Sequence, residues 1–100
     1  MTNRRSKLEI YVHIMEEIRS GNIKPTKIMY AGNLSWKPLQ QMLKSLIVQE
    51  LIEEYESEEG DNRTSKVYRL TDKGQSVLHY FGKAKELVED KKLVEIRNWR

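Results

Sequence analysis

Apolar residues in the first fifth of the chain recur at intervals of three and four, which is the pattern of a helix that buries one face. This stripe covers residues 6–19, and Gly21 and Asn22 follow it as helix-ending residues. His13 falls on the polar side of the same segment and is expected to be solvated. The apolar positions are Leu8, Ile10, Tyr11, Val12, Ile14, Met15 and Ile18.

A second, shorter helix is predicted to begin at Pro25 and Thr26, with Thr26 as its N-cap. The segment KIMYAG supplies its apolar residues. Gly32 and Asn33 then form a turn, because both residue types accept positive φ. A third helix follows over Ser35–Val48. Two helices joined by a tight, glycine-containing turn have the spacing of a helix-turn-helix.

The third helix separates into two faces when its residues are placed at about 100° intervals. The polar face carries Lys37, Gln41 and Lys44, with Gln40 and Ser45 beside them. Lysine can contact guanine or phosphate, and glutamine can pair with adenine, so this face suits a DNA major groove. Lysine and glutamine are also common on any solvated helix face. The opposite, buried face is formed by Leu39, Met42, Leu43, Leu46 and Ile47.

The start of this third helix contains a proline. If Ser35 is the N-cap, Pro38 occupies the third helical position, where a missing N–H costs no intrahelical bond. The Ser35 hydroxyl is then expected to accept from the Lys37 N–H. An alternative start, with Lys37 as the cap, stays open. Trp36 is expected to pack as an anchor against the first helix or the hairpin, in preference to stacking on DNA.

Two short segments after the third helix predict a β-hairpin, at residues 51–57 and 65–71 around the polar loop EEGDNRTS. A hairpin directly after a helix-turn-helix is a wing. Arg63 and Lys66, on its tip and returning side, suit phosphate or a minor groove. Its first strand is acidic and should be repelled by DNA.

A last helix is predicted from Thr71, as N-cap, to about Asn98, a length of roughly 40 Å. Gly74 and Gly82 allow a bend or a later start. So long a helix outruns a small domain, and its apolar stripe needs a partner, most simply a second copy of the chain. The stripe consists of Tyr80, Phe81, Ala84, Leu87, Val88 and Val94. The expected division is a DNA-binding domain over residues 1–72 and a dimerisation helix over residues 73–100.

The composition excludes several classes of protein but does not identify the function. The 100 residues are 38% hydrophobic and 33% charged, with a net charge of +3 and no cysteine, so disulfides and thiolate chemistry are excluded. No apolar run is long enough for a membrane span, and the basic N-terminus lacks a secretory pattern. His13 and His79 have no evident catalytic or metal partners. We therefore expect a cytoplasmic, nucleoid-associated protein that is not an enzyme and has no metal or cofactor.

Two segments carry a resemblance to a known family: Thr26–Leu39 and the sequence LTDKG over Leu70–Gly74. From Arg4 to about Leu87 the chain resembles the archaeal winged-helix predicted transcriptional regulators. That family includes small dimeric DNA-binding proteins with a C-terminal antiparallel coiled coil. The resemblance implies a winged helix, DNA binding by the third helix and the wing, and dimerisation through the last helix. The acidic first strand departs from the family pattern.

The sequence thus predicts a mainly α fold with a small β-hairpin (α+β), which binds double-stranded DNA as a dimeric transcriptional regulator. Two other hypotheses stay open: an architectural, chromatin-like DNA binder, and a protein-interaction module that does not bind DNA. The residues predicted to contact DNA are Thr26, Lys27, Tyr30, Ser35, Lys37, Gln40, Gln41, Lys44, Arg63 and Lys66.

Overall fold

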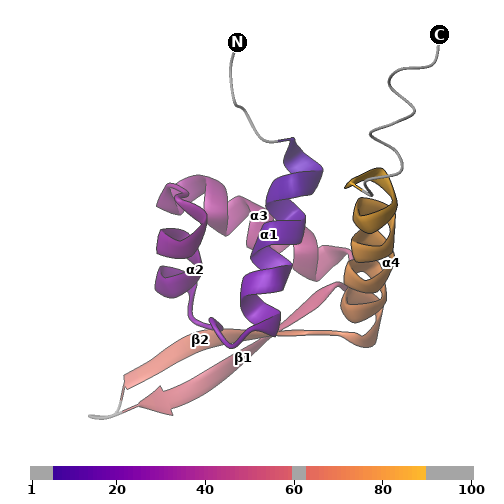
Figure 1. Cartoon of the computed structure of the whole chain (residues 1–100). Coiled ribbons are helices and arrows are strands. Elements are labelled where there is room, and N and C mark those ends of the chain that lie inside the picture. Colours follow the sequence, from indigo (N-terminus) through magenta and orange to yellow (C-terminus); the bar gives the residue numbers. More distant parts are fainter. Residues whose placement is uncertain (1–5, 60–62, 90–100) are drawn as a thin grey trace, which may run out of the picture.

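The computed structural model describes residues 6–59 and 63–89. The hairpin projects from a body of three helices, and the fourth helix returns beside the first (Figure 1). The predicted fold class, mainly α with a small β-hairpin, is confirmed. The elements in order are α1 (Lys7–Arg19), α2 (Pro25–Gly32), α3 (Trp36–Val48), β1 (Ile52–Glu59), β2 (Arg63–Leu70) and α4 (Asp72–Glu89).

One hydrophobic core contains residues from all six elements, and only the outer part of the hairpin lies beyond it. Ile14 of α1, Ile28 of α2 and Leu39 of α3 are each 0% exposed. The predicted stripe of α1 is largely correct, although Leu8 at its start stays 55% exposed. The remaining fully or nearly buried members are Val12, Met15, Ile18, Leu43, Leu46, Leu51, Ile52, Tyr68 and Leu78.

The end of α1 and the start of α2 show one correct and one incorrect expectation. The predicted Thr26 N-cap of α2 is wrong: Lys24 is the N-cap and Pro25 occupies the first helical position. Proline explains the difference, because its fixed φ suits that first position and it favours an extended residue before it. Lys24 has that extended backbone, at φ −92° and ψ 140°. Gly21 ends α1 as expected, with a φ of 112°.

The hairpin is confirmed and is longer than predicted. Its antiparallel register runs from Ile52 opposite Leu70 to Glu59 opposite Arg63. Tyr68 is 2% exposed and belongs to the core, and its backbone N–H donates to the Ile23 carbonyl at 3.0 Å. The α1–α2 connection therefore lies along one edge of β2, and β1 covers the other edge.

Thr71 joins the end of α3 to the start of α4. Its hydroxyl donates to the Glu50 carbonyl at 2.6 Å and accepts from the Gly74 N–H at 2.9 Å. Its backbone N–H donates to the Leu51 carbonyl at 3.1 Å. The predicted N-cap role of Thr71 is therefore confirmed, and the same side chain also satisfies a carbonyl just past the end of α3.

Lys73 adds a second link at this place. Its ammonium group donates to the Gln49 carbonyl at 2.9 Å, and Gln49 is the C-cap residue of α3. Glu50 turns the chain with a φ of 65°, which brings these carbonyls toward α4. We call this set of contacts, formed by Gln49, Glu50, Leu51, Thr71, Lys73 and Gly74, the α3–α4 junction.

The first turns of α4 pack into the core, and its later turns do not. Leu78 is 4% exposed, whereas Leu87 and Val88 are 67% and 72% exposed. The predicted end of this helix near Asn98 lies outside the described residues. The division of the chain at residue 72 stays a prediction.

The two glycines of α4 give a matched test of the α3–α4 junction. A Cβ at Gly74 would lie 2.1 Å from the Leu51 carbonyl oxygen, whereas a Cβ at Gly82 meets nothing within 4 Å. We expect Gly74→Ala to destabilise the fold by about 1–3 kcal/mol through overpacking. Gly82→Ala should stabilise it by about 0.5–1 kcal/mol through helix propensity. Urea unfolding of both variants measures the difference, and equal stabilities would contradict this description.

Candidate nucleic-acid interface

The turn between α2 and α3 sets the direction of α3. Asn33 is left-handed, at φ 53° and ψ 47°, and its N–H donates to the Tyr30 carbonyl at 3.2 Å. The Leu34 N–H donates to the Met29 carbonyl at 3.0 Å. Gly32 does not use its conformational freedom as expected, because it ends α2 without a positive φ. Its role is steric, since an added Cβ would lie 3.2 Å from the Leu34 side chain.

The two predicted faces of α3 are confirmed. Leu39, Leu43 and Leu46 are at most 1% exposed and point into the core. The α3 polar face, defined here as Lys37, Gln40, Gln41 and Lys44, lies on the other side. Three of these side chains are exposed and Gln40 is partly buried. No carboxylate lies within α3, so this face offers donors and positive charge to a polyanion.

Ser35 is the N-cap of α3, as predicted, but its side chain makes no capping hydrogen bond. The expected bond from the Lys37 N–H is therefore wrong. The alternative start, with Lys37 as the cap, is also wrong, because the helix begins at Trp36. Pro38 at the third position has no N–H to donate, which removes the partner that a capping serine commonly uses. The Ser35 hydroxyl is left exposed beside the polar face.

Two aromatic side chains lie near the same turn with much of their surface exposed. Tyr30 of α2 is 77% exposed and Trp36 of α3 is 48% exposed. The prediction that Trp36 is a packed anchor is wrong, because a first-turn residue lies at the rim of the core. The alternative for Trp36, stacking on DNA, agrees with this exposure.

Thr26 and Lys27 are exposed in the first turn of α2. The amides of a helix start carry a partial positive charge, which favours an anion nearby. A lysine and a hydroxyl at that place can both bind phosphate oxygens. The structure thus leaves these two side chains, like Tyr30, accessible at the outer side of α2.

The hairpin offers fewer positive groups. Lys66 is 60% exposed, and its ammonium group lies 3.8 Å from the Glu54 carboxylate. An exposed ion pair of this kind contributes little, so phosphate can replace it. Arg63 begins β2, but the position of its side chain lies outside what the structure describes. Exposed Glu53, Glu54 and Glu56 on β1 oppose DNA, as the sequence indicated.

Two tyrosines are held on the hairpin by its glutamates. The Tyr68 hydroxyl donates to Glu54 at 3.0 Å. Burial, assisted by this bond, raises the pKa of Tyr68 well above its ordinary value of 10. On the other face, the Tyr55 hydroxyl donates to Glu53, and this bond raises the pKa of Tyr55. The Arg69 guanidinium lies 5.1 Å from the Tyr55 ring centroid and covers it.

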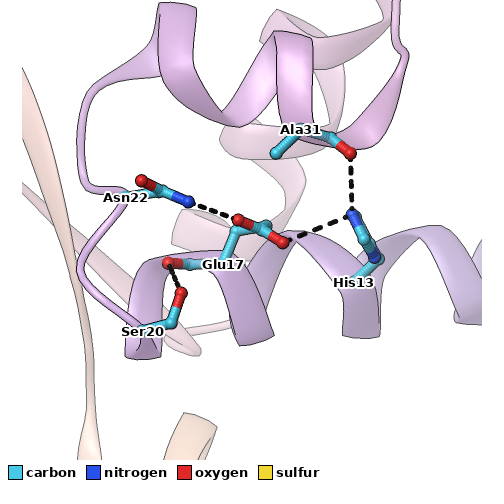
Figure 2. A network of polar contacts seen from close by, with 5 residues as sticks. All are labelled: His13, Glu17, Ser20, Asn22 and Ala31. Atoms are coloured by element: carbon cyan, nitrogen blue, oxygen red, sulfur yellow. Dashed lines mark hydrogen bonds and ion pairs between the residues drawn. The ribbon is translucent and has the colours of Figure 1, made fainter.

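A polar network links α1 to α2, and here the sequence expectation is wrong (Figure 2). His13 is not simply solvated, because its Nε2 lies 3.3 Å from the Ala31 carbonyl and 3.7 Å from the Glu17 carboxylate. Asn22 donates to the same carboxylate. The i, i+4 spacing of His13 and Glu17 could have indicated the pairing. The network supports the end of α2, directly before the turn into α3.

A second side-chain bond holds α3 against α1. The Tyr11 hydroxyl donates to the Ser45 hydroxyl at 2.9 Å, and Gln49 donates to the same oxygen at 3.0 Å. Ser45, like Gln40, is partly buried at the edge of the polar face, and its hydroxyl is engaged with Tyr11 of α1.

Neither a metal site nor a membrane span is found in the described part of the chain. Across residues 6–59 and 63–89, no three His, Cys, Asp or Glu side chains lie close enough to hold a metal ion. No helix in these ranges is long and apolar enough to cross a membrane.

A family model described as a winged helix-turn-helix matches residues 4–89. An uncharacterized protein of the archaeon Methanocaldococcus jannaschii is 35% identical over 75 residues. That match covers 75% of this chain but only 31% of the relative, so the chain spans about a third of the length of the curated protein it matches.

Solved structures of bacterial regulators share the fold. A point mutant of MepR from Staphylococcus aureus superposes with a TM-score of 0.75 at 18% identity, covering 95% of this chain and 66% of MepR. PadR from Bacillus subtilis, in complex with operator DNA, gives a TM-score of 0.65 at 22% identity, covering 75% of this chain and 46% of PadR. At these identities the likeness concerns the fold alone.

Two N-cap serines allow a test of how α3 begins. The Ser6 hydroxyl accepts from the Glu9 N–H at 3.1 Å, and the Glu9 carboxylate accepts from the Ser6 N–H at 2.8 Å. The Ser35 side chain makes no capping bond. We expect Ser6→Ala to cost about 1 kcal/mol of stability and Ser35→Ala less than about 0.5 kcal/mol. Thermal unfolding measures both. A cost for Ser35→Ala as large as that for Ser6→Ala would show that its hydroxyl caps α3.

Proposed function

This chain belongs to the winged helix-turn-helix family, and from that premise we propose that it binds double-stranded DNA as a dimeric transcriptional regulator, with α3 in the major groove. The observation that carries the proposal is the α3 polar face, where Lys37, Gln41 and Lys44 are exposed and no acidic residue intervenes. PadR, whose structure contains operator DNA, supports this use of the fold.

Gln41 and Lys44 are the proposed base-reading residues of this surface. A glutamine amide can pair with both the N6 and N7 positions of adenine, and a lysine can donate to guanine O6 and N7. Both lie on α3, whose opposite side is held in the core by buried Leu43 and joined to α1 by the Tyr11–Ser45 bond. A rigid helix favours specific contacts, because little side-chain and backbone freedom is lost on binding. Lys37, in the first turn, and partly buried Gln40 flank this pair.

Phosphate contacts are proposed for the surrounding exposed groups. From α2, the side chains of Thr26, Lys27 and Tyr30 would bind phosphates of the DNA backbone. The Ser35 hydroxyl, which makes no capping bond, is available for the same purpose at the start of α3. On the wing, Lys66 would exchange Glu54 for phosphate. Arg63, whose side chain lies outside what the structure describes, stays a contact proposed from the sequence. These contacts fix the position of the protein without reading sequence.

Dimerisation is proposed through the exposed stripe of α4. Tyr80, Leu87 and Val88 are 67–72% exposed, and Ala84 lies exposed between them. Phe81 packs partly against the core of its own chain, so it would contribute only its free edge. Val94 lies outside the described residues. Apolar side chains gathered on one helix beyond the core favour a partner, and a second α4 offers the same stripe.

The DNA assignment predicts a specific loss of charge-dependent affinity. Lys37→Ala with Lys44→Ala should weaken binding to duplex DNA. For every phosphate that the protein no longer neutralises, the slope of log affinity against log salt should fall by about 0.9. Fluorescence anisotropy over a salt series measures both quantities.

The matched control is Lys83→Ala with Lys85→Ala, which removes the same charge from α4, away from the α3 polar face. Its affinity and salt slope should stay close to those of the unchanged protein. Equal effects of the two double variants would mean that binding follows net charge and does not involve the α3 polar face.

The dimer assignment predicts that Leu87→Ser with Val88→Ser yields a monomer of unchanged fold, because both side chains are largely exposed within one chain. Sedimentation equilibrium gives the mass, and circular dichroism checks the helices. The control is Val48→Ser, which changes a valine of α3 that is 80% exposed, and this variant should remain dimeric. A monomer in the unchanged protein at high concentration would contradict the proposal.

A further inference from the structure

The outer edge of β1 presents unpaired backbone groups. The Tyr68 N–H donates to Ile23, away from β1, so Tyr68 and its opposite residue Glu54 form a non-hydrogen-bonded pair. Because such pairs alternate along an antiparallel ladder, the N–H and C=O groups of Ile52, Glu54 and Glu56 point outward from the hairpin. In the described part of the chain the sheet has only two strands, so no third strand takes these groups.

An open groove of about 830 Å³ lies along this edge, between the end of α3 and the start of α4. Its accessible apolar wall is formed by the partly buried side chains of Ile47 in α3 and Leu70 in β2, whereas Ile52 of β1, which also lines the groove, is 1% exposed and belongs to the core. The groove therefore combines a strip of backbone hydrogen-bonding groups with apolar surface. This pairing of features is what an extended peptide needs in order to add to a sheet edge.

The charge of the groove selects the partner. Glu50, Glu53, Glu54 and Asp72 all line it. The one lysine among the described residues that line it, Lys73, already donates to the α3 C-cap carbonyl. An excess of carboxylates repels DNA, and it repels the identical edge of a second copy. It attracts a chain that carries lysine or arginine.

We propose that this β1 edge groove binds an extended, basic segment of a partner protein, which adds to β1 as a further strand. The segment pairs with the backbone of Ile52–Glu56 and alternates lysine or arginine with β-branched residues. Its cations meet the carboxylates on the rim, and its apolar side chains cover Ile47 and Leu70. The proposal is independent of DNA binding, because it uses no residue of the α3 polar face.

The probe is a fluorescein-labelled peptide of alternating lysine and valine, titrated into the full-length protein at low salt. Anisotropy should show saturable binding that weakens as salt is added. An equivalent peptide with glutamate in place of lysine should not bind. Hydrogen exchange followed by NMR should show slower exchange at the Glu54 and Glu56 amides once the peptide is bound.

A second pair of probes tests strand addition itself. One lysine–valine peptide carries N-methyl groups on its odd amides and the other on its even amides. Since only alternate amides of an added strand face its neighbour, one peptide should lose binding and the other should keep it. If both bind equally, the groove holds cations without strand pairing, and the proposal is overturned.

The charge requirement is tested with two variants of equal net charge. Glu50→Gln with Glu53→Gln removes two carboxylates from the groove and should weaken peptide binding roughly fivefold. Glu16→Gln with Glu86→Gln removes two exposed carboxylates from α1 and α4 and should leave it unchanged. Equal weakening by both variants would overturn the proposal. So would the absence of binding at millimolar peptide, or protection of β1 amides by self-association alone.

Discussion

The hydrogen bonds of the Thr71 hydroxyl are the contacts on which the arrangement of this molecule depends. That one group satisfies a carbonyl past the end of α3 and an amide in the first turn of α4. Both groups would otherwise be left without an intrahelical partner. The backbone approaches so closely here that only glycine fits at position 74, against the Leu51 carbonyl. The base of the hairpin lies between the two helices, so α3, the wing and α4 keep one relative orientation.

That fixed orientation makes the α3 polar face useful as a binding surface. Its apolar side is buried at Leu39, Leu43 and Leu46, and the Tyr11–Ser45 bond joins it to α1. At its other end, the left-handed Asn33 and the network of His13 and Glu17 support the turn that precedes it. Lysine and glutamine on a mobile helix would bind polyanions without discrimination. Held in one place, the same residues would be able to discriminate between base pairs, as we propose.

The charges of the chain are separated so that two surfaces can act independently. The α3 polar face has no carboxylate, whereas β1 and the groove along its free edge are rich in them. Carboxylates on an edge strand also discourage the pairing of identical chains. The proposed DNA surface and the proposed peptide groove thus select partners of opposite charge.

Periodicity and residue type in the sequence determined the elements, the buried face of each helix, the cap at Thr71 and the exposed character of Lys37, Gln41 and Lys44. These features follow from local rules, because spacing alone decides which residues share a face. Only the tertiary structure decided the exposure of Trp36, the contact of His13 with the Ala31 carbonyl and the bond between Ser45 and Tyr11. It alone also showed that, within the described residues, the outer edge of β1 is free and lies along a groove. Such features depend on which surfaces meet when the elements pack together, and the order of residues along one element carries no information about its neighbours.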